Sequence, residues 1–223
     1  MRFEIITKTL MKNLILVCFL ITSLMVSNAF AQQVDLVKAL KDKKLVPRAN
    51  TQVEVSASDH GKQAISVNGI VWLKEIDFKE GTIEIDIRGN DILQGTFPGV
   101  IFHAVDSITF DAVYFRPFNF QATDPVRKIH AVQYVSPPQY TWSFLRETKN
   151  GIYEKAVTPA PGANDWFHAM IVVKGKEINV YVNDSKTPSL TVTKLNDRTT
   201  GRFGLISDDG QKPGEFANLV VRK

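Results

Sequence analysis

Two acidic side chains, Glu84 and Asp86, lie two residues apart in the segment GTIEIDIRG. This spacing places both carboxylates on one face of a β-strand. Retaining glycoside hydrolysis uses two carboxyl groups about 5–5.5 Å apart, one as nucleophile and one as acid/base. The next side chain on that face is Arg88, and an arginine cannot protonate a leaving group at neutral pH. The segment therefore predicts a solvated strand face and makes this glycosidase mechanism unlikely.

A second stretch, residues 110–142, brings aromatic, amide, guanidinium and imidazole groups together on extended chain. In the segment DAVYFRPF, strand alternation places Val113 and Phe115 on one face and Tyr114 and Arg116 on the other. A guanidinium can make paired hydrogen bonds to neighbouring hydroxyl groups, and an aromatic ring can cover the C–H face of a sugar. The face that carries Tyr114 and Arg116 is therefore predicted to bind a saccharide.

The same alternation adds residues from neighbouring strands to this surface. Val100 and Phe102 in GVIFHAV are predicted to be core, which leaves His103 on the opposite face, and Gln133 lies opposite its neighbour Val132 in HAVQYV. Four residues that follow the segment HAVQYV are predicted to form a rim, namely Trp142, Arg146, Glu147 and Tyr153. The candidate ligand-binding set comprises His103, Tyr114, Arg116, Gln133, Trp142, Arg146 and Glu147.

A structural interpretation of this stretch stays open beside the binding one. In it, residues 119–128 cover the polar side chains and Arg116 pairs with a structural carboxylate such as Glu147, because a buried guanidinium needs a partner with or without a ligand. The remaining tryptophans, Trp72 and Trp166, are predicted to be core.

The sequence predicts no metal site and no cofactor. His60, His103, His130 and His168 do not form a helical histidine pair, and none has a carboxylate at a spacing typical of metal ligands. The turn Asp208-Asp209-Gly210 could hold a structural calcium ion but is equally typical of a loop.

Nearly every apolar run is short, β-branched and bounded by Gly, Pro, Asn or Asp, which indicates an all-β chain. An N-terminal segment, residues 32–50, precedes the domain, and one short helix or linker is expected in it at residues 34–40. We expect a single domain, residues 51–223, folded as two antiparallel sheets packed face to face. Strands are predicted at residues 52–56, 63–67, 81–88, 100–104, 111–118, 129–135, 142–146, 167–173, 178–182, 190–192, 202–206 and 216–221.

The first thirty-one residues have the features of a secretory signal peptide. A basic start precedes an apolar run at residues 14–26 and a small-residue ending at Ala29-Phe30-Ala31, so cleavage is expected before Gln32. Translation could equally begin at Met11, which opens a complete signal of its own. The apolar run is shorter than the roughly 20 residues that a membrane-spanning helix needs. The protein is therefore expected in the periplasm or outside the cell, with no membrane insertion after cleavage.

Charge and cysteine content limit the partners of the mature chain. Removing Arg2, Lys8, Lys12 and Glu4 from the 27 basic and 23 acidic residues leaves 24 and 22, a balance that disfavours nucleic acid. The single cysteine, Cys18, lies within the signal, so the expected mature chain contains no disulfide.

Several segments together carry a family resemblance. DFKEGTIEIDIRG, GVIFHAVD, AVYFRP, WFHAMIVVKGKEINVYVND and GRFGLISDDG with GEFANLVV resemble successive landmarks of the concanavalin A-like lectin/glucanase superfamily over residues 53–221. The resemblance implies a jelly roll in which the outer face of one sheet is often concave and holds sugar. Fold alone does not decide among the activities that this superfamily contains.

Three functions follow from the resemblance. The first is a secreted protein that recognises carbohydrate on the concave sheet face. The second is a glycoside-cleaving enzyme similar to 3-keto-disaccharide hydrolases, in which Glu147 or Glu154 would act as acid/base with help from His103. The third is a laminin-G-like module that binds proteins through its loops. The pair Glu84 and Asp86 does not match the family 16 glycosidase pattern, because Arg88 stands near the position of that family's second glutamate.

Overall fold

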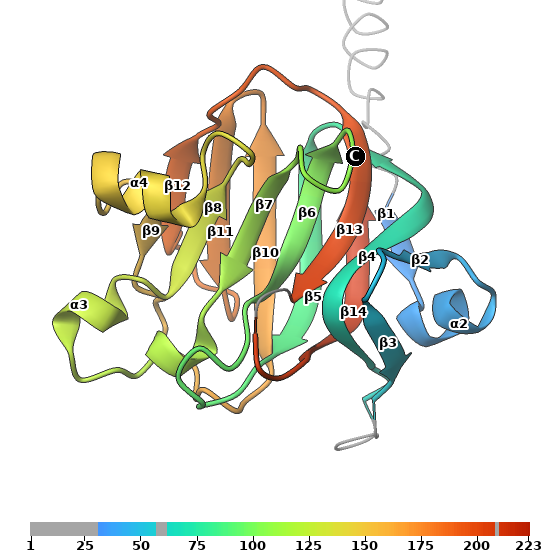
Figure 1. Cartoon of the computed structure of the whole chain (residues 1–223), viewed down its shortest axis with the longest axis horizontal. Coiled ribbons are helices and arrows are strands. Elements are labelled where there is room, and N and C mark those ends of the chain that lie inside the picture. Colours follow the sequence, from blue (N-terminus) through green and yellow to red (C-terminus); the bar gives the residue numbers. More distant parts are fainter. Residues whose placement is uncertain (1–30, 57–61, 208–209) are drawn as a thin grey trace, which may run out of the picture. The chain divides into compact units, whose positions relative to one another are not determined.

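The computed structural model describes residues 31–56, 62–207 and 210–223 (Figure 1). The predicted signal peptide, except Ala31, lies outside the described residues. So do His60 and the aspartates of the turn considered for calcium. Within the described part of the chain, no helix has the length and apolar character needed to cross a membrane.

The described residues form a two-layered antiparallel β-sandwich with short helices at its margin, which confirms the predicted all-β jelly roll. The strand order is β12-β11-β10-β5-β14-β4-β13-β6-β7-β8-β9, with β1 pairing to β14 and both β2 and β3 pairing to β4. Sheet A contains β1 (Ala31–Val34), β3 (Gln52–Val55), β5 (Gly81–Arg88), β10 (Phe167–Lys174), β11 (Glu177–Val182), β12 (Leu190–Thr193) and β14 (Gly214–Arg222). Sheet B contains β2 (Leu45–Pro47), β6 (Pro98–Ala104), β7 (Asp111–Phe115), β8 (Val132–Val135), β9 (Glu154–Lys155) and β13 (Gly201–Ser207).

One long strand, β4 (Ile65–Phe78), belongs to both sheets. Its first residues pair with β3 and β14 of sheet A, whereas residues 69–78 pair with β13 of sheet B. Gly69 stands at this transition with a φ of 118°, and a Cβ there would lie 2.4 Å from Oγ1 of Thr51. Glycine fits both requirements because it has no Cβ.

The core between the sheets agrees with the alternation in the sequence. Ile83, Ile85 and Ile87 of β5 are fully buried, whereas Glu84 and Asp86 between them are partly exposed. Alternation along the strands predicts ten core residues, and each of them has no exposed surface, namely Ile83, Ile85, Ile87, Phe102, Val113, Phe115, Val180, Val182, Phe203 and Leu219.

The structure corrects the prediction of a strand at residues 142–146. That segment is the helix α4 (Trp142–Thr148), which begins after Thr141, whose hydroxyl accepts a hydrogen bond from the amide of Phe144. A threonine in this position is a favourable N-cap, and this local signal outweighs the apolar composition of the segment.

Other predicted strands are shorter than expected. The strand at residues 111–118 ends at Phe115, since Pro117 begins a 3-10 helix, η1 (Pro117–Asn119). The strand at residues 129–135 begins at Val132, because α3 (Pro125–Lys128) occupies the chain just before it. Trp166, expected in the core, is only partly buried.

The segment before residue 50 packs onto the sandwich. Helix α2 (Leu36–Lys41) begins after Asp35, whose carboxylate accepts a hydrogen bond from the amide of Lys38 at 2.9 Å. Leu36 and Val37 of this helix are buried in the same core as the strands. In Figure 1, α2 lies beside β2 and β3 at one end of the sandwich.

Candidate functional site

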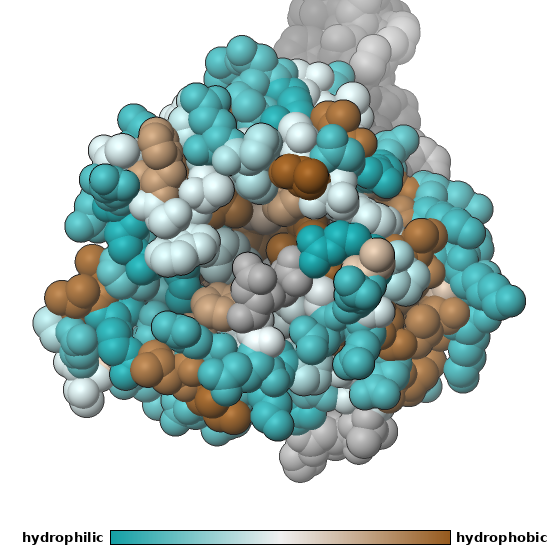
Figure 2. Space-filling view, viewed as in Figure 1, coloured by the Kyte–Doolittle hydropathy of each residue, from teal (hydrophilic) through white to brown (hydrophobic). Residues whose placement is uncertain are grey.

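A cavity of about 560 Å³ opens on the face of sheet B that points away from sheet A. Phe115 of β7 contacts Phe167 of sheet A, with ring centres 5.0 Å apart, so the alternate residues Ala112 and Tyr114 face outward into the cavity. Figure 2 shows this face hollowed near its centre, with hydrophobic side chains inside the hollow and hydrophilic ones around it. The cavity is lined by Leu93, Gln94, Phe97, Phe110, Ala112, Tyr114, Arg116, Phe118, Asn119, Arg127, His130, Val135, Pro137, Thr141, Trp142, Arg146 and Ile206.

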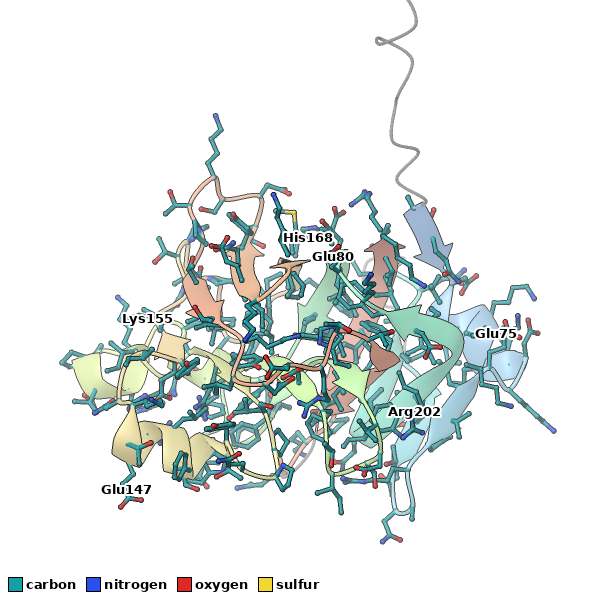
Figure 3. The ribbon with its side chains drawn as sticks, turned by 90° about the horizontal axis from the view of Figure 1, so that it is seen from above. Glu75, Glu80, Glu147, Lys155, His168 and Arg202 are labelled. Carbon is teal, nitrogen blue, oxygen red and sulfur yellow. The ribbon has the colours of Figure 1, made fainter. Side chains whose placement is uncertain are left out.

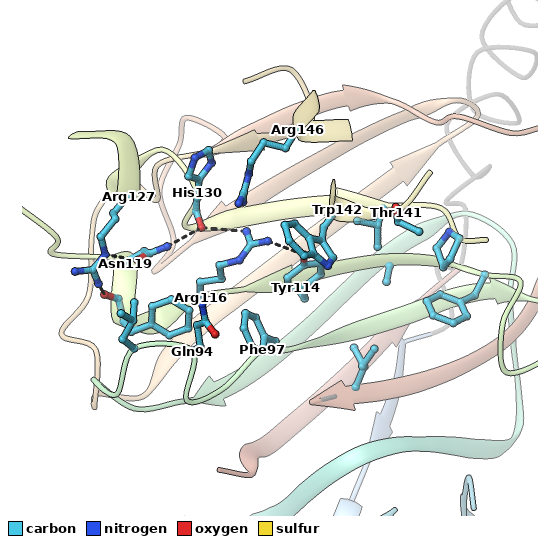
Figure 4. A pocket seen from close by; sticks show the side chains of 17 residues that line it. Gln94, Phe97, Tyr114, Arg116, Asn119, Arg127, His130, Thr141, Trp142 and Arg146 are labelled. Carbon is cyan, nitrogen blue, oxygen red and sulfur yellow. Dashed lines mark hydrogen bonds between the residues drawn. The ribbon is translucent and has the colours of Figure 1, made fainter. Parts of the chain in front are cut away.

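Arg116 lies at the base of the cavity and is almost completely buried (Figure 4). Its Nη2 donates to the hydroxyl of Tyr114 at 2.8 Å and to Oε1 of Gln133 at 2.6 Å. Its Nη1 donates to the carbonyl oxygen of His130 at 3.1 Å, and the hydroxyl of Tyr114 donates to the same Oε1 of Gln133 at 2.8 Å. These bonds fix the guanidinium in one orientation.

Glu154 of β9 lies beneath the cavity and is 2% exposed. Its carboxylate accepts hydrogen bonds from Nε of Arg146 at 3.1 Å and from Nη2 of Arg146 at 2.9 Å, a bidentate pair. Nη1 of Arg116 lies 3.6 Å from the same carboxylate. Burial raises the pKa of Glu154, but the hydrogen bonds and charges of these arginines outweigh it and hold the pKa below its ordinary value. Glu154 is therefore ionised at neutral pH.

His130 lines the cavity beside this carboxylate. Its Nδ1 lies 2.8 Å from Oε2 of Glu154, although the two atoms are not aligned for a hydrogen bond. Burial lowers the pKa of His130, and the positive charges of Arg146 and Arg116 lower it further against the opposing effect of Glu154. The imidazole is therefore neutral at neutral pH.

An aromatic platform stands at the mouth of the cavity. Trp142 of α4 is half exposed, and the guanidinium carbon of Arg146 lies 5.2 Å from the centre of its ring. Deeper in, Phe97 packs edge-to-face on Phe118 and Tyr114, with ring centres 5.6 and 6.3 Å apart. The cavity thus combines ring faces for apolar contact with fixed hydrogen-bond donors.

Four of the seven candidate residues identified in the sequence line this cavity: Tyr114, Arg116, Trp142 and Arg146. Gln133 lies beneath them, fully buried and bonded to Arg116 and Tyr114. Glu147 lies on the exposed side of α4, and Figure 3 shows it at the edge of the molecule, pointing outward. The carboxylate partner of Arg116 is therefore Glu154, not Glu147. Tyr153, expected at the rim, is buried against Tyr134.

His103 does not reach the cavity. It has no exposed surface, and its Nδ1 and Nε2 lie 3.1 Å from Oδ2 of Asp111 and 2.7 Å from the carbonyl oxygen of Lys79. The expected alternation fails here because His103 has a φ of 52°, and the pairing of β6 with β13 shifts register at this point. A bulge of this kind changes the face to which a side chain points.

Sequence reasoning missed several residues of the cavity. Asn119, Arg127 and His130 come from the segment that was considered only as a cover, and Phe97 comes from the loop before β6. The basic cluster Arg127-Lys128 followed by His130 was the available signal, whereas nothing in the sequence pointed to Phe97.

The carboxylates and histidines of the described residues do not gather into a group of three that could hold a metal ion. The predicted absence of a metal site in the mature protein remains a prediction.

The family profile described as 3-keto-alpha-glucoside-1,2-lyase-like domain matches residues 38–222, which is most of the chain. The chain belongs to this family. Among solved structures, a Bacillus subtilis protein of unknown function with a galectin-like fold aligns with a TM-score of 0.53 at 12% identity, covering 86% of this chain and 96% of that one. This likeness concerns the fold alone.

A lower similarity is found to the carbohydrate-binding module CBM66 of Bacillus subtilis, with a TM-score of 0.49 and 15% identity over 76% of this chain and 92% of that one. A search of curated proteins finds no match.

Proposed function

We propose that this family member is a secreted protein that binds a saccharide in the cavity on the outer face of sheet B. The observation that carries the proposal is the half-exposed ring of Trp142 above a floor of fixed polar groups around Arg116. A sugar ring can place its C–H face on the indole while its hydroxyls replace water at the polar groups. The description of the family, 3-keto-alpha-glucoside-1,2-lyase-like, supports the same class of ligand.

Binding is tested by a glycan array followed by calorimetric titration of the best ligand. Trp142→Ala should weaken binding by roughly tenfold or more, because aromatic contacts dominate such sites. Phe144→Ala is the matched control, since Phe144 is also an exposed aromatic residue of α4 but does not line the cavity. Equal losses in the two variants, or no glycan binding by the parent protein, would contradict the proposal.

Arg116→Lys tests whether the buried guanidinium serves the ligand or only the fold. A lysine keeps the charge but cannot reproduce the bonds to Tyr114 and Gln133. We expect the loss in binding free energy to be larger than the loss in the free energy of unfolding. A fall in stability with unchanged affinity would assign Arg116 a purely structural role.

A second candidate function, elimination across C1 and C2 of a 3-keto sugar, is favoured by the position of His130. The proton on C2 is acidic beside a C3 ketone, and a neutral imidazole at the cavity is suited to accept it. The electron pair of the C2–H bond would form the C1=C2 double bond as the C1–O bond breaks, and the leaving oxygen would take a proton. Glu154 is a poor acid for that proton because its pKa is lowered, and Glu147 is too remote.

Turnover is tested by incubating the protein with 3-keto and ordinary disaccharides and following the released sugar. His130→Gln should abolish turnover and preserve binding. Binding without turnover of either series would leave the saccharide-binding function and remove the enzymatic one.

Export is tested separately by mass spectrometry of the secreted protein, which should begin at or near Gln32. A mature form that retains residues 14–26 would contradict export through the predicted signal.

A further inference from the structure

The cavity has an uneven balance of charge. Its described lining residues include three arginines, Arg116, Arg127 and Arg146, but no aspartate or glutamate. The carboxylate of Glu154 lies beneath them and pairs with Arg146 and Arg116. Three guanidinium groups against one carboxylate leave two positive charges uncompensated, with His130 neutral.

Arg127 is the clearest uncompensated charge. Its Nε donates to Oδ1 of Asn119 at 3.2 Å and its Nη2 donates to the carbonyl oxygen of Phe118 at 2.8 Å, and both acceptors are uncharged. No carboxylate of the described residues forms an ion pair with it. The two bonds hold the guanidinium in place, and in Figure 4 Arg127 lies on the other side of Arg116 from Trp142. Its Nη1 makes no hydrogen bond with the described residues.

Arg146 also keeps donor capacity. Glu154 occupies its Nε and Nη2, which leaves the two N–H groups of Nη1 without a hydrogen-bond partner among the described residues. The side chain is a third exposed, beneath the half-exposed Trp142. The cavity therefore presents fixed, unsaturated guanidinium groups at two positions.

A ligand that fills this cavity removes water from these cations. A neutral sugar satisfies N–H groups but leaves the charge uncompensated, and desolvating an unpaired charge opposes binding. A carboxylate or sulfate ester compensates the charge and accepts the paired, charge-assisted hydrogen bonds for which a guanidinium is suited.

Building on the proposed saccharide binding, we propose that the cavity selects an acidic saccharide, one that carries a carboxylate or a sulfate ester, and that Arg127 binds the acidic group. Arg127 is thereby a specificity-determining residue, whereas Trp142 contributes to the binding of any sugar. The shared chemistry is an oxyanion on a sugar ring.

The experiment uses matched ligand pairs. Uronate-containing oligosaccharides are titrated beside the same oligosaccharides after reduction of each carboxylate to a primary alcohol, and sulfated oligosaccharides beside their desulfated forms. The acidic member of at least one series should bind about tenfold more tightly, since a charge-assisted hydrogen bond contributes that much. Polyglutamate should not compete, because it offers the charge without the sugar ring.

Arg127→Gln should reduce the preference for the acidic member, measured as the ratio of the two affinities, to nearly nothing. Lys128→Gln is the matched control, because it removes an equal charge from the next residue, which is exposed and lies outside the cavity. Arg127→Lys should retain part of the preference for the acidic member. If Arg127→Gln does not fold, Arg127→Lys is tested in its place.

The outcomes separate this inference from the proposed function. Equal affinity for both members of every pair, an Arg127→Gln preference equal to that of the parent, or competition by polyglutamate would overturn the acidic ligand while saccharide binding stands. Failure of every saccharide, acidic or neutral, would instead overturn the proposed function.

Discussion

Two buried carboxylates of sheet B, Asp111 and Glu154, each lie beside an arginine and a histidine, yet they differ in how far these neighbours are exposed. Asp111 is completely buried. Its oxygens lie 3.1 Å from Nδ1 of His103, 2.6 Å from the hydroxyl of Tyr134 and 3.2 Å from Nη2 of Arg198. His103 and Tyr134 have no exposed surface and the Arg198 side chain is 21% exposed, so this cluster, here called the sealed cluster, is enclosed on every side but that of Arg198.

The Glu154 cluster is built from similar groups but is open on one side. Glu154 is buried, whereas Arg146 is a third exposed and His130 lines the cavity. The comparison teaches that a buried ion pair can serve two purposes. A cluster whose groups pair mainly with one another stabilises the fold, whereas a cluster with donors that face a cavity can orient those donors toward a ligand.

The largest expected effect is on the sealed cluster. Asp111→Asn should lower the free energy of unfolding by about 3–5 kcal/mol, because it leaves Arg198 without its counter-charge and disturbs the hydrogen bond to the buried His103. Chemical denaturation measures the loss, and Asp197→Asn is the control because Asp197 is highly exposed in its pair with Lys176. A loss no greater than that of the control would show that the sealed cluster does not stabilise the fold.

Glu154→Gln is the equivalent change in the open cluster. It should lower the free energy of unfolding less than Asp111→Asn does, and it should weaken saccharide binding more. We expect a loss of roughly 1–3 kcal/mol of unfolding free energy, since Arg146 can regain water. Saccharide affinity should fall because Arg146 loses the carboxylate that orients it. Denaturation and titration of one preparation measure both quantities, and the comparison fails if Asp111→Asn affects binding as strongly as Glu154→Gln.

The histidines sharpen the comparison through pH. Burial lowers the pKa of His130 from 6.5 in the folded protein. Between the folded pKa and 6.5, the unfolded state therefore binds more protons than the folded state does. The contribution of His130 to the free energy of unfolding rises with pH in that window. The pKa of His168 is raised, first by its hydrogen bond to Asp86 at 2.9 Å. The contribution of His168 to the free energy of unfolding is complete below pH 6.5 and is lost as the pH rises through the folded pKa.

Unfolding measured across this range for His130→Gln and His168→Gln should therefore give differences from the parent protein with opposite slopes. Slopes of the same sign would show that the direction of the pKa shift is wrong for one of the two histidines.

The smallest effect is expected for Glu147→Ala, which should change neither stability by more than about 0.5 kcal/mol nor saccharide affinity. Glu147 is exposed on α4 one residue after Arg146. Thermal unfolding and titration check this, and a clear loss of binding would extend the site beyond the cavity.

Strand alternation predicted the core because it depends only on neighbouring residues. It placed Ile83, Ile85 and Ile87 correctly, and it also placed Tyr114 and Arg116 on the face that forms the cavity. It could not place His103, since the positive φ at that residue depends on a register shift between two strands far apart in sequence.

The remaining site residues required tertiary information. The pairing of Arg146 and Arg116 with Glu154 depends on how β9 and α4 meet, which no local pattern encodes. The helix at Trp142 has a local signal in its capping residue Thr141, although the apolar composition of the segment favours a strand.

The placement of β14 has a consequence for how sheet A folds. β14 lies between β5 and β4 inside sheet A and also pairs with β1. Each of these pairings joins segments that are far apart in the sequence, and closing such long loops costs conformational entropy before the pairing can stabilise the sheet. Sheet A therefore cannot form from local contacts alone.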